Sequence, residues 1–324
     1  MIIWNWNASE ALIICKFAYS VTIMSSHPST DLHTDPSLYA GLDVYVVAGN
    51  PISHSKSPAI HQRFAEQSKQ VMHYGRLQPE IDGFAKAAKA FFTAGGKGMN
   101  VTVPFKLDAQ VFADQLTTRA RLAGAVNTLW IQNGKIYGDN TDGAGLVRDL
   151  LAQGIAIHES RILLLGAGGA ARGVIGPLLE QAPKCLVIAN RSSAKADELV
   201  KSFANLAAAK EVSLESRTVA DLESSEKTPY PFDVVINATA AGLSDESPVS
   251  AAAVANIFTP SSFAYDMVYG KTTAFMQQAL QRGSRISDGL GMLVEQAADA
   301  FLLWRGAELA SHIDPRAVLA KLRS

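Results

Sequence analysis

A glycine-rich turn between an apolar strand and a helix constrains the fold of this chain more than any other feature. Residues 161–165 (RILLL) are typical of a buried strand, and they lead through 166–171 (GAGGAA) into a helical segment. In the pattern G-x-G-x-x-A, Gly166 permits a tight turn, Gly168 lets the backbone approach a pyrophosphate, and the small Ala171 lets the helix pack on the strand. Free N–H groups at the start of a helix also attract phosphate. Glycine turns serve plain strand-to-helix packing as well, but with both flanking elements the pattern predicts a dinucleotide-binding turn.

Strand-like and helix-like segments alternate along the rest of the chain, which is typical of a parallel sheet with helices on both faces. Asn133-Gly134 between two strand-like runs predicts a hairpin. Ser57 is expected to cap a helix that begins near Pro58, and the weakly patterned segment 203–230 is expected to hold a short strand and a helix. The other expected strands are 42–48, 99–103, 126–132, 135–137, 185–189, 232–237 and 263–266, and the other expected helices are 80–94, 143–153 and one that ends near Glu180.

Length and composition exclude several classes of protein. A chain of 324 residues suggests two domains. Its 29 basic and 30 acidic residues form no block of like charge, so no nucleic-acid or membrane-surface footprint is present. Two cysteines without a Cys-x-x-Cys motif indicate a reducing, cytoplasmic location. The seven histidines show no metal-ligand spacing, and no apolar run reaches the ~20 residues of a membrane helix.

Residues 1–42 are expected to form a loose N-terminal extension, with a linker-like composition over 25–37. Translation could alternatively start at Met24. The competing interpretation is that the first segment of the chain is amphipathic and packs weakly on the rest of the protein.

The end of the strand after the glycine turn indicates the cofactor. An NAD site usually carries Asp or Glu there, which accepts a hydrogen bond from the ribose 2′-hydroxyl. This chain instead has Asn190-Arg191-Ser192, with Lys195 one helical turn further on. Arg191 can bind a 2′-phosphate through its planar guanidinium, and Lys195 adds charge. Two solvated surface cations are the ordinary alternative, but the position favours NADP(H).

Four polar clusters lie in the first half of the chain, each at the end of an expected strand or the start of a helix. Taken singly, each has an ordinary explanation: Ser57 and Asp142 can be helix caps, and Lys106 a solvated surface residue. The clusters are 50–58 (NPISHSKSP), 100–106 (NVTVPFK), 124–128 (GAVNT) and 138–143 (GDNTDG).

Together with later motifs, these clusters resemble the shikimate dehydrogenase family, in its bacterial NADP-dependent form. The resemblance runs from about Val44 to beyond Arg305. It rests on nine motifs in order: GNPISHSKSP, GGKGMNVTVPFK, GAVNT, GDNTDG, LLGAGGAARG, NRS, INAT, YDMVY and DGLGMLVEQAA.

The resemblance implies roles for individual residues. Ser55 and Ser57 match the pair that holds the substrate carboxylate, and Lys106, paired with Asp142, matches the catalytic lysine. Which of the two transfers the proton is not determined by the sequence. Thr102, Asn127 and Asp142 match residues that bind the ring hydroxyls and the reacting oxygen of the substrate. Tyr269 and Gln296 match substrate contacts from the other side of the cleft between the two domains. The expected cofactor site comprises Gly166, Ala167, Gly168, Gly169, Ala170, Asn190, Arg191, Ser192, Lys195, Met267 and Gly289.

A few positions depart from the family pattern. Lys195 stands where a second arginine is common, which keeps the charge but loses the bidentate fork. Alanines at 170–171 and 240–241 stand where serines often occur.

The expected fold is a two-domain α/β structure, with an N-terminal α/β substrate domain and a Rossmann-type NADP-binding domain. The substrate domain is expected over 43–142 plus 288–324 and the NADP-binding domain over 143–287, after the 1–42 extension. The expected activity is reversible reduction of 3-dehydroshikimate to shikimate with NADPH, a step towards chorismate and the aromatic amino acids. The expected partner is this small-molecule substrate, and no binding to nucleic acid, membrane or metal is expected. The sequence does not determine the oligomeric state, and a homodimer is one possibility.

Two alternative functions are compatible with this fold. A quinate/shikimate dehydrogenase that uses NAD would differ first at the 2′-phosphate site, and Arg191 argues against it. A catalytically silent metabolite sensor on the same fold would be indicated by loss of Lys106 or Asp142, and both are present.

Overall fold

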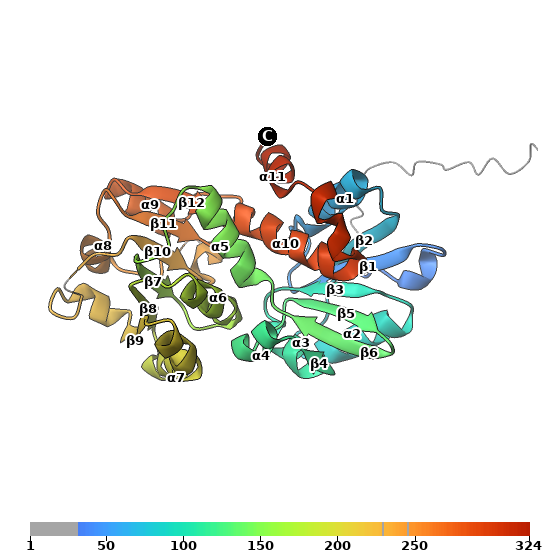
Figure 1. Ribbon diagram of the computed structural model, residues 1–324, viewed down its shortest axis with the longest axis horizontal. Coiled ribbons are helices and arrows are strands. Elements are labelled where there is room, and N and C mark those ends of the chain that lie inside the picture. The colour runs from blue at the N-terminus through green and yellow to red at the C-terminus, as the bar shows by residue number, and fades with distance from the viewer. Residues whose placement is uncertain (1–31, 229, 245) are drawn as a thin grey trace, which may run out of the picture.

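The computed structural model describes residues 32–228, 230–244 and 246–324, which fold around two six-stranded sheets (Figure 1). The first sheet has the strand order β2-β1-β3-β5-β6-β4. It is mixed, because β1, β2 and β3 run parallel while β5 is antiparallel to both β3 and β6. Its strands are β1 (Asp43–Ala48), β2 (Met72–Leu77), β3 (Gly98–Val101), β4 (Gln115–Leu116), β5 (Thr128–Gln132) and β6 (Lys135–Asp139).

The hairpin that joins β5 and β6 confirms the prediction from Asn133-Gly134. Both residues have positive φ, 52° and 72°, as the tight turn between two twisted strands requires. This hairpin is why the first sheet is mixed and not wholly parallel.

Helices cover both faces of the first sheet. A core between the sheet and α2 includes Val46, Phe91 and Leu129, all buried. On the other face, His61 of α1 stacks on Tyr74 of β2, and Phe64 of α1 packs against Phe301 of a C-terminal helix. The helices are α1 (Ser57–Ser68), α2 (Phe84–Thr93), α3 (Lys106–Phe112) and α4 (Thr118–Ala123).

The second sheet is parallel throughout and has the order β12-β11-β10-β7-β8-β9. Ile162 and Leu164 of β7 face one core, and Leu163 and Leu165 face the other. A parallel sheet with two buried faces is what the uninterrupted apolar run predicts. The strands are β7 (Arg161–Leu165), β8 (Cys185–Asn190), β9 (Ser213–Thr218), β10 (Val234–Asn237), β11 (Phe263–Asp266) and β12 (Arg285–Asp288).

Helices also cover both faces of the second sheet, so the predicted α/β class is confirmed. One face is covered by α5 (Asp142–Ala152), α6 (Gly169–Glu180) and α7 (Ser193–Ala209), and the other by α8 (Ala251–Ile257) and α9 (Ala274–Gln281). The weakly patterned segment after α7 contains β9 and a short 3₁₀ helix at Ala220–Glu223.

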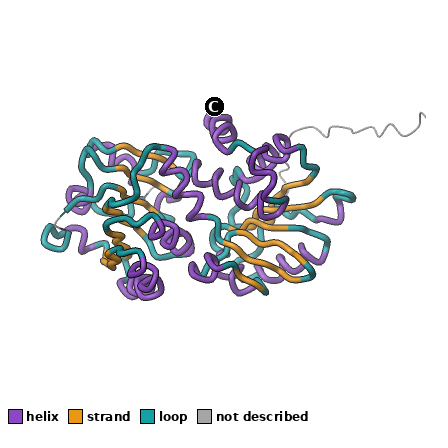
Figure 2. Tube along the Cα trace, viewed as in Figure 1, coloured by secondary structure: helices purple, strands orange, loops and turns teal. Residues whose placement is uncertain are grey.

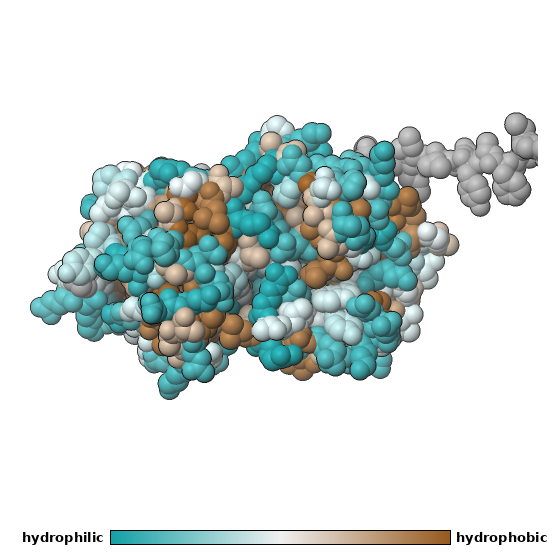
Figure 3. Space-filling view, viewed as in Figure 1, coloured by the Kyte–Doolittle hydropathy of each residue, from teal (hydrophilic) through white to brown (hydrophobic). Residues whose placement is uncertain are grey.

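The helix α10 (Leu290–Arg305) joins the two halves of the molecule and lies between the two sheets (Figures 1 and 2). It packs against α5 and α1, and Arg148 of α5 donates to Glu295 of α10 at 3.1 Å. The chain ends in α11 (Pro315–Arg323). The face shown in Figure 3 is mostly hydrophilic, with hydrophobic residues in small separate patches.

The described part of the expected N-terminal extension, residues 32–42, packs against the first sheet and is not loose. His33 forms an antiparallel bridge with Leu77, and Gln78 donates from its backbone to the carbonyl of Leu32 at 2.8 Å. This pairing satisfies backbone groups on β2, which is the edge strand of the sheet. The expectations for residues 1–31 lie outside the described residues.

The helix cap expected of Ser57 is wrong, and so is the alternative explanation of Asp142 as a helix cap. Ser57 is the first residue of α1, and no side chain caps this helix. Asp142 is likewise the first residue of α5 and does not cap it. Both side chains are therefore available for other contacts. None of the helices described is long and apolar enough to cross a membrane.

Candidate active site

The four polar clusters meet at one edge of the first sheet. Residues 49–57 follow β1, 102–106 follow β3 and 140–142 follow β6. Asn127 directly precedes the antiparallel strand β5, so it lies at the same edge. The carboxyl ends of parallel strands are where open α/β sheets bind their ligands.

An ion pair lies at the centre of this edge. Lys106, the first residue of α3, and Asp142, the first residue of α5, approach to 2.6 Å between Nζ and Oδ2. Their side chains are only 14% and 6% exposed. The other carboxylate oxygen of Asp142 accepts a hydrogen bond from Asn127 Nδ2 at 2.9 Å. Both oxygens of Asp142 are therefore engaged, while the Lys106 ammonium keeps N–H groups that this bond does not use.

Asn127 links the ion pair to α10. Its Nδ2 lies 3.0 Å from Gln296 Oε1 and 2.9 Å from Thr141 Oγ1, and its Oδ1 accepts from the backbone N–H of Thr141 at 2.9 Å. Thr141 is fully buried and was not among the predicted site residues. Its position inside the polar motif GDNTDG was the available signal. Gln296 lies 169 residues from Asn127 in sequence, so only the fold brings them together.

The two predicted serines lie at a second point of the same edge. Ser55 and Ser57 are 8% and 4% exposed, and the backbone N–H of Ser57 donates to Ser55 Oγ at 3.3 Å. Tyr269, which follows β11 of the other sheet, lies beside them. Burial raises the pKa of Tyr269, while hydrogen bonds to the Lys56 backbone and the Ser55 side chain, together with a nearby arginine charge, oppose the rise.

Two residues near the serines were not among the predicted site residues, although Asn100 begins the polar cluster 100–106. Arg76 donates from Nη2 to the carbonyl oxygen of Ser55 at 3.0 Å. Asn100 accepts from the Tyr74 hydroxyl at 2.7 Å and donates to Thr128 Oγ1 at 3.3 Å. The local signal for Arg76 was weak, because it is a polar residue inside an edge strand. Thr102, which was predicted, follows Asn100 by two residues, and its backbone N–H donates to the carbonyl of Ala48 at 2.9 Å.

The glycine turn approaches the ion pair from the second sheet. Gly166 has φ +111°, which favours glycine, and a Cβ there would come within 3.2 Å of the Ala238 carbonyl oxygen. Gly168 is the N-cap of α6, and a Cβ on it would meet no other described atom within 4 Å. A Cβ on Gly169 would lie 3.3 Å from Lys106 Cβ. The turn thus comes next to the lysine at Gly169, and Ala167 and Ala170 belong to the same turn.

The remaining predicted cofactor residues lie at the carboxyl edge of the second sheet. At the end of β8, Asn190 Nδ2 donates to the Ser192 carbonyl at 3.0 Å, and Arg191 is exposed. Lys195 is exposed in the first turn of α7. Gly289 lies against Met267, and a Cβ on it would come within 2.2 Å of the Met267 carbonyl oxygen. This edge therefore brings together the glycine turn and two exposed cations, Arg191 and Lys195.

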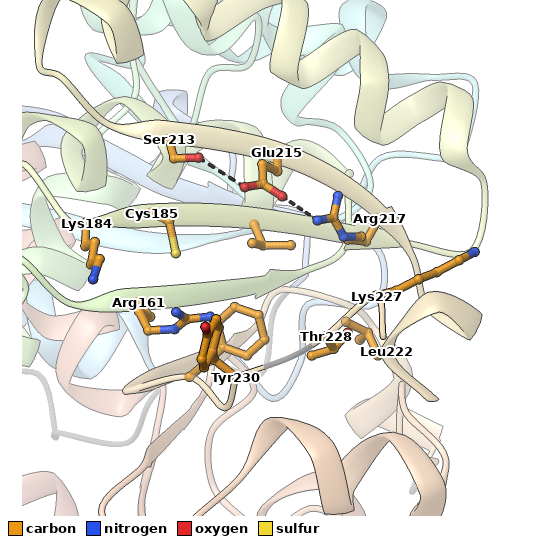
Figure 4. A pocket seen from close by; sticks show the side chains of 12 residues that line it. Arg161, Lys184, Cys185, Ser213, Glu215, Arg217, Leu222, Lys227, Thr228 and Tyr230 are labelled. Carbon is orange, nitrogen blue, oxygen red and sulfur yellow. Dashed lines mark hydrogen bonds and ion pairs between the residues drawn. The ribbon is translucent and has the colours of Figure 1, made fainter. Parts of the chain in front are cut away.

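A separate pocket of about 310 Å³ begins at the amino ends of the second sheet's strands and extends along β9 to Arg217 (Figure 4). Arg161, Cys185 and Ser213, which begin β7, β8 and β9, line it. Burial raises the pKa of the Cys185 thiol. The pocket contains none of the predicted site residues, and amino ends of strands are not where such sheets bind nucleotides. The described residues contain no group of three or more His, Cys, Asp or Glu that could hold a metal ion.

Two protein-family models match this chain, one in its N-terminal part and one in its central part. Residues 47–129 match the model of the shikimate dehydrogenase substrate binding domain, and 149–255 match the model of shikimate / quinate 5-dehydrogenase. The chain is 48% identical over 295 residues to a shikimate dehydrogenase (NADP(+)) of Cupriavidus taiwanensis, covering 90% of this chain and 96% of that protein. It is 53% identical over 268 residues to the Vibrio atlanticus protein of the same name, covering 82% and 92%.

A solved structure supports the same likeness. Shikimate 5-dehydrogenase from Thermus thermophilus, in complex with NADP(H) and shikimate, superimposes with a TM-score of 0.73 at 29% identity. The match covers 87% of this chain and 99% of that one.

Proposed function

This chain belongs to the shikimate dehydrogenase family, and on that premise we propose that it is an NADP-dependent shikimate dehydrogenase. It reduces 3-dehydroshikimate to shikimate with NADPH, reversibly, on the route to chorismate and the aromatic amino acids. The observation that carries the proposal is the buried Lys106–Asp142 pair, which lies directly beside the glycine turn.

Lys106 donates the proton in this reaction. Reduction of a ketone needs a hydride at carbon and a proton at oxygen, and bound NADPH supplies the hydride. Asp142 holds the Lys106 ammonium in place through its 2.6 Å contact, and Asn127 holds the second oxygen of Asp142. The remaining N–H groups of Lys106 stabilise the developing alkoxide and deliver the proton. Lys106 is thus the acid, and Asp142 orients it.

The substrate carboxylate binds at the serine pair, and the ring hydroxyls bind near the ion pair. Ser55, Ser57 and Tyr269 offer hydroxyl donors close to one another. Thr102, Asn127 and Gln296 complete the other side of the site. This arrangement fixes the ring with its reacting oxygen towards Lys106, which is the geometric condition for efficient transfer.

The residues at the second sheet fit NADP(H). The open space beside Gly168 and the N-terminus of α6 suit the pyrophosphate. Arg191, with Lys195 nearby, binds the 2′-phosphate, and no carboxylate in 190–195 repels it.

We also propose the division into a substrate domain, 43–142 plus 288–324, and an NADP-binding domain, 143–287. The core that joins α1 to α10 and α11 supports it. A cytoplasmic location and a homodimer belong to the same proposal, and size-exclusion chromatography with light scattering tests the dimer.

The test of the function is the absorbance of reduced nicotinamide with purified protein. Shikimate and quinate are each supplied with NADP⁺ and with NAD⁺. Rapid reduction of NADP⁺ by shikimate alone is the expected result. Activity with NAD⁺ and quinate would instead identify the chain as a quinate/shikimate dehydrogenase that uses NAD. A folded protein with no activity would favour the metabolite sensor.

A further inference from the structure

Arg76 reaches the serine segment from the neighbouring strand. It lies near the carboxyl end of β2, beside Val47 of β1, and its Nη2 donates to the Ser55 carbonyl at 3.0 Å. Thr34 fixes its backbone from the other side, donating to the Arg76 carbonyl at 3.0 Å and accepting from the Arg76 N–H at 3.1 Å. Gln78, two residues further on, accepts from the backbone of Ile52 at 3.1 Å. The end of β2 therefore holds the serine segment in place.

Two tyrosines, Tyr74 and Tyr269, lie close enough to Arg76 for its positive charge to affect their pKa values. Burial raises the pKa of both Tyr74 and Tyr269, and the positive charge of Arg76 opposes the rise in each. The Ser57 side chain also opposes the rise in the pKa of Tyr74, and the Ser55 side chain does so for Tyr269, so each tyrosine hydroxyl lies near one of the serines. The guanidinium, both serines and both tyrosines thus form one cluster.

The cluster needs a positive charge if it is to hold a carboxylate. Serine and tyrosine hydroxyls are neutral donors, and a carboxylate removed from water without a countercharge is costly to bury. The Lys106 ammonium is already balanced by Asp142. An arginine stays charged at every working pH.

We propose that Arg76 determines the preference of this site for substrates that carry a carboxylate, because its charge balances the anion that Ser55 and Ser57 bind. The proposal rests on the proposed function and goes beyond it, since it assigns the countercharge of the carboxylate to a residue outside the serine motif. The competing explanation is purely structural: Arg76 would hold the Ser55 carbonyl in place and contribute no charge.

A comparison of two substrates separates these explanations. Initial rates are measured with shikimate and with its uncharged methyl ester, for wild type, Arg76→Gln, Arg76→Lys and Arg63→Gln. Arg63 lies on α1 and controls for the loss of one positive charge. Arg76→Gln should lower kcat/KM for shikimate by about 10- to 100-fold, mainly through KM, because a hydrogen bond or contact to a charged group contributes about that factor.

For the methyl ester, the same variant should lose about threefold or less, because the ester has no charge to balance. Arg76→Lys should recover part of the shikimate activity, and Arg63→Gln should match wild type. Equal losses on both substrates would overturn the proposal in favour of the structural role, and so would an unchanged KM for shikimate. Absence of shikimate activity in wild type would instead refute the proposed function.

Discussion

Replacing His61 with phenylalanine is expected to make the folded protein less sensitive to acid. His61 lies on α1 and is fully buried. Its ring stacks on Tyr74 with centroids 4.2 Å apart and lies 5.2 Å from the Trp304 ring. Burial lowers its pKa from the ordinary 6.5 to about 3, and the Asn100 side chain opposes this only in part. The folded protein therefore holds His61 neutral well below neutral pH.

The size of the effect follows from the difference in pKa between the two states. Between pH 6.5 and about 3, the unfolded chain binds a proton at His61 that the folded chain does not bind. The contribution of His61 to stability is complete above pH 6.5 and is lost as pH falls, by up to about 1.4 kcal/mol per pH unit. Between pH 7 and pH 5, wild type should lose about 2 kcal/mol more than His61→Phe.

Urea unfolding followed by circular dichroism at pH 7 and pH 5 measures this difference. Phenylalanine preserves an aromatic ring against Tyr74, and a constant loss of stability in the variant cancels between the two pH values. His61→Gln serves as a second variant without the titrating group. A differential loss below about 0.5 kcal/mol would refute the reasoning. An NMR titration provides the independent check, because the His61 ring resonance should stay constant from pH 8 to pH 5.

Two further substitutions, with a third as a control, test the cofactor site and the buried carboxylate of Asp149. Arg191→Gln should raise KM for NADP⁺ by about tenfold or more and leave NAD⁺ kinetics unchanged, because only NADP⁺ carries the 2′-phosphate; equal changes for both cofactors would contradict the assignment. Asp149→Ala should cost about 2–4 kcal/mol in urea unfolding, because the buried carboxylate accepts from Tyr265 and Arg316, each at 2.8 Å. Glu198→Gln, which removes an exposed ion pair with Arg172, should cost far less than Asp149→Ala, and similar losses in both variants would count against the reasoning.

Local patterns account for the parts of the fold that the sequence predicted. The strand β7 and the turn at Gly166 were predictable because a strand buried on both faces is apolar at every position, and the turn chemistry is encoded in consecutive residues. The hairpin at Asn133-Gly134 was predictable for the same reason. In each case, neighbours in sequence determine the conformation.

Edge strands were harder to predict. β2 (MHYGRL) and β12 (RISD) carry polar residues, and each lies at the edge of its sheet. An edge strand is covered on fewer sides, so its hydrophobic pattern is weak. Neither strand was predicted, although β2 supplies Arg76.

The polar contacts of the site depend on residues far apart in sequence. Gln296 and Tyr269 entered the prediction only through resemblance to a family, because nothing near them in the chain indicates contact with Asn127 or Ser55. Asp142 read locally as a helix cap, yet its carboxylate contacts Lys106 instead. Such contacts follow from how the sheets and α10 pack together, and no local pattern encodes that packing.

The most direct test of the account is turnover of Lys106→Met and Asp142→Asn beside wild type, with NADP⁺ affinity measured by calorimetry on the same samples. If Lys106 delivers the proton and Asp142 orients it, Lys106→Met should lower kcat by about 10²- to 10⁴-fold, and Asp142→Asn should also lower it. Both variants should bind NADP⁺ as wild type does. Turnover of Lys106→Met within about tenfold of wild type, in a folded protein that binds NADP⁺, would contradict the central claim.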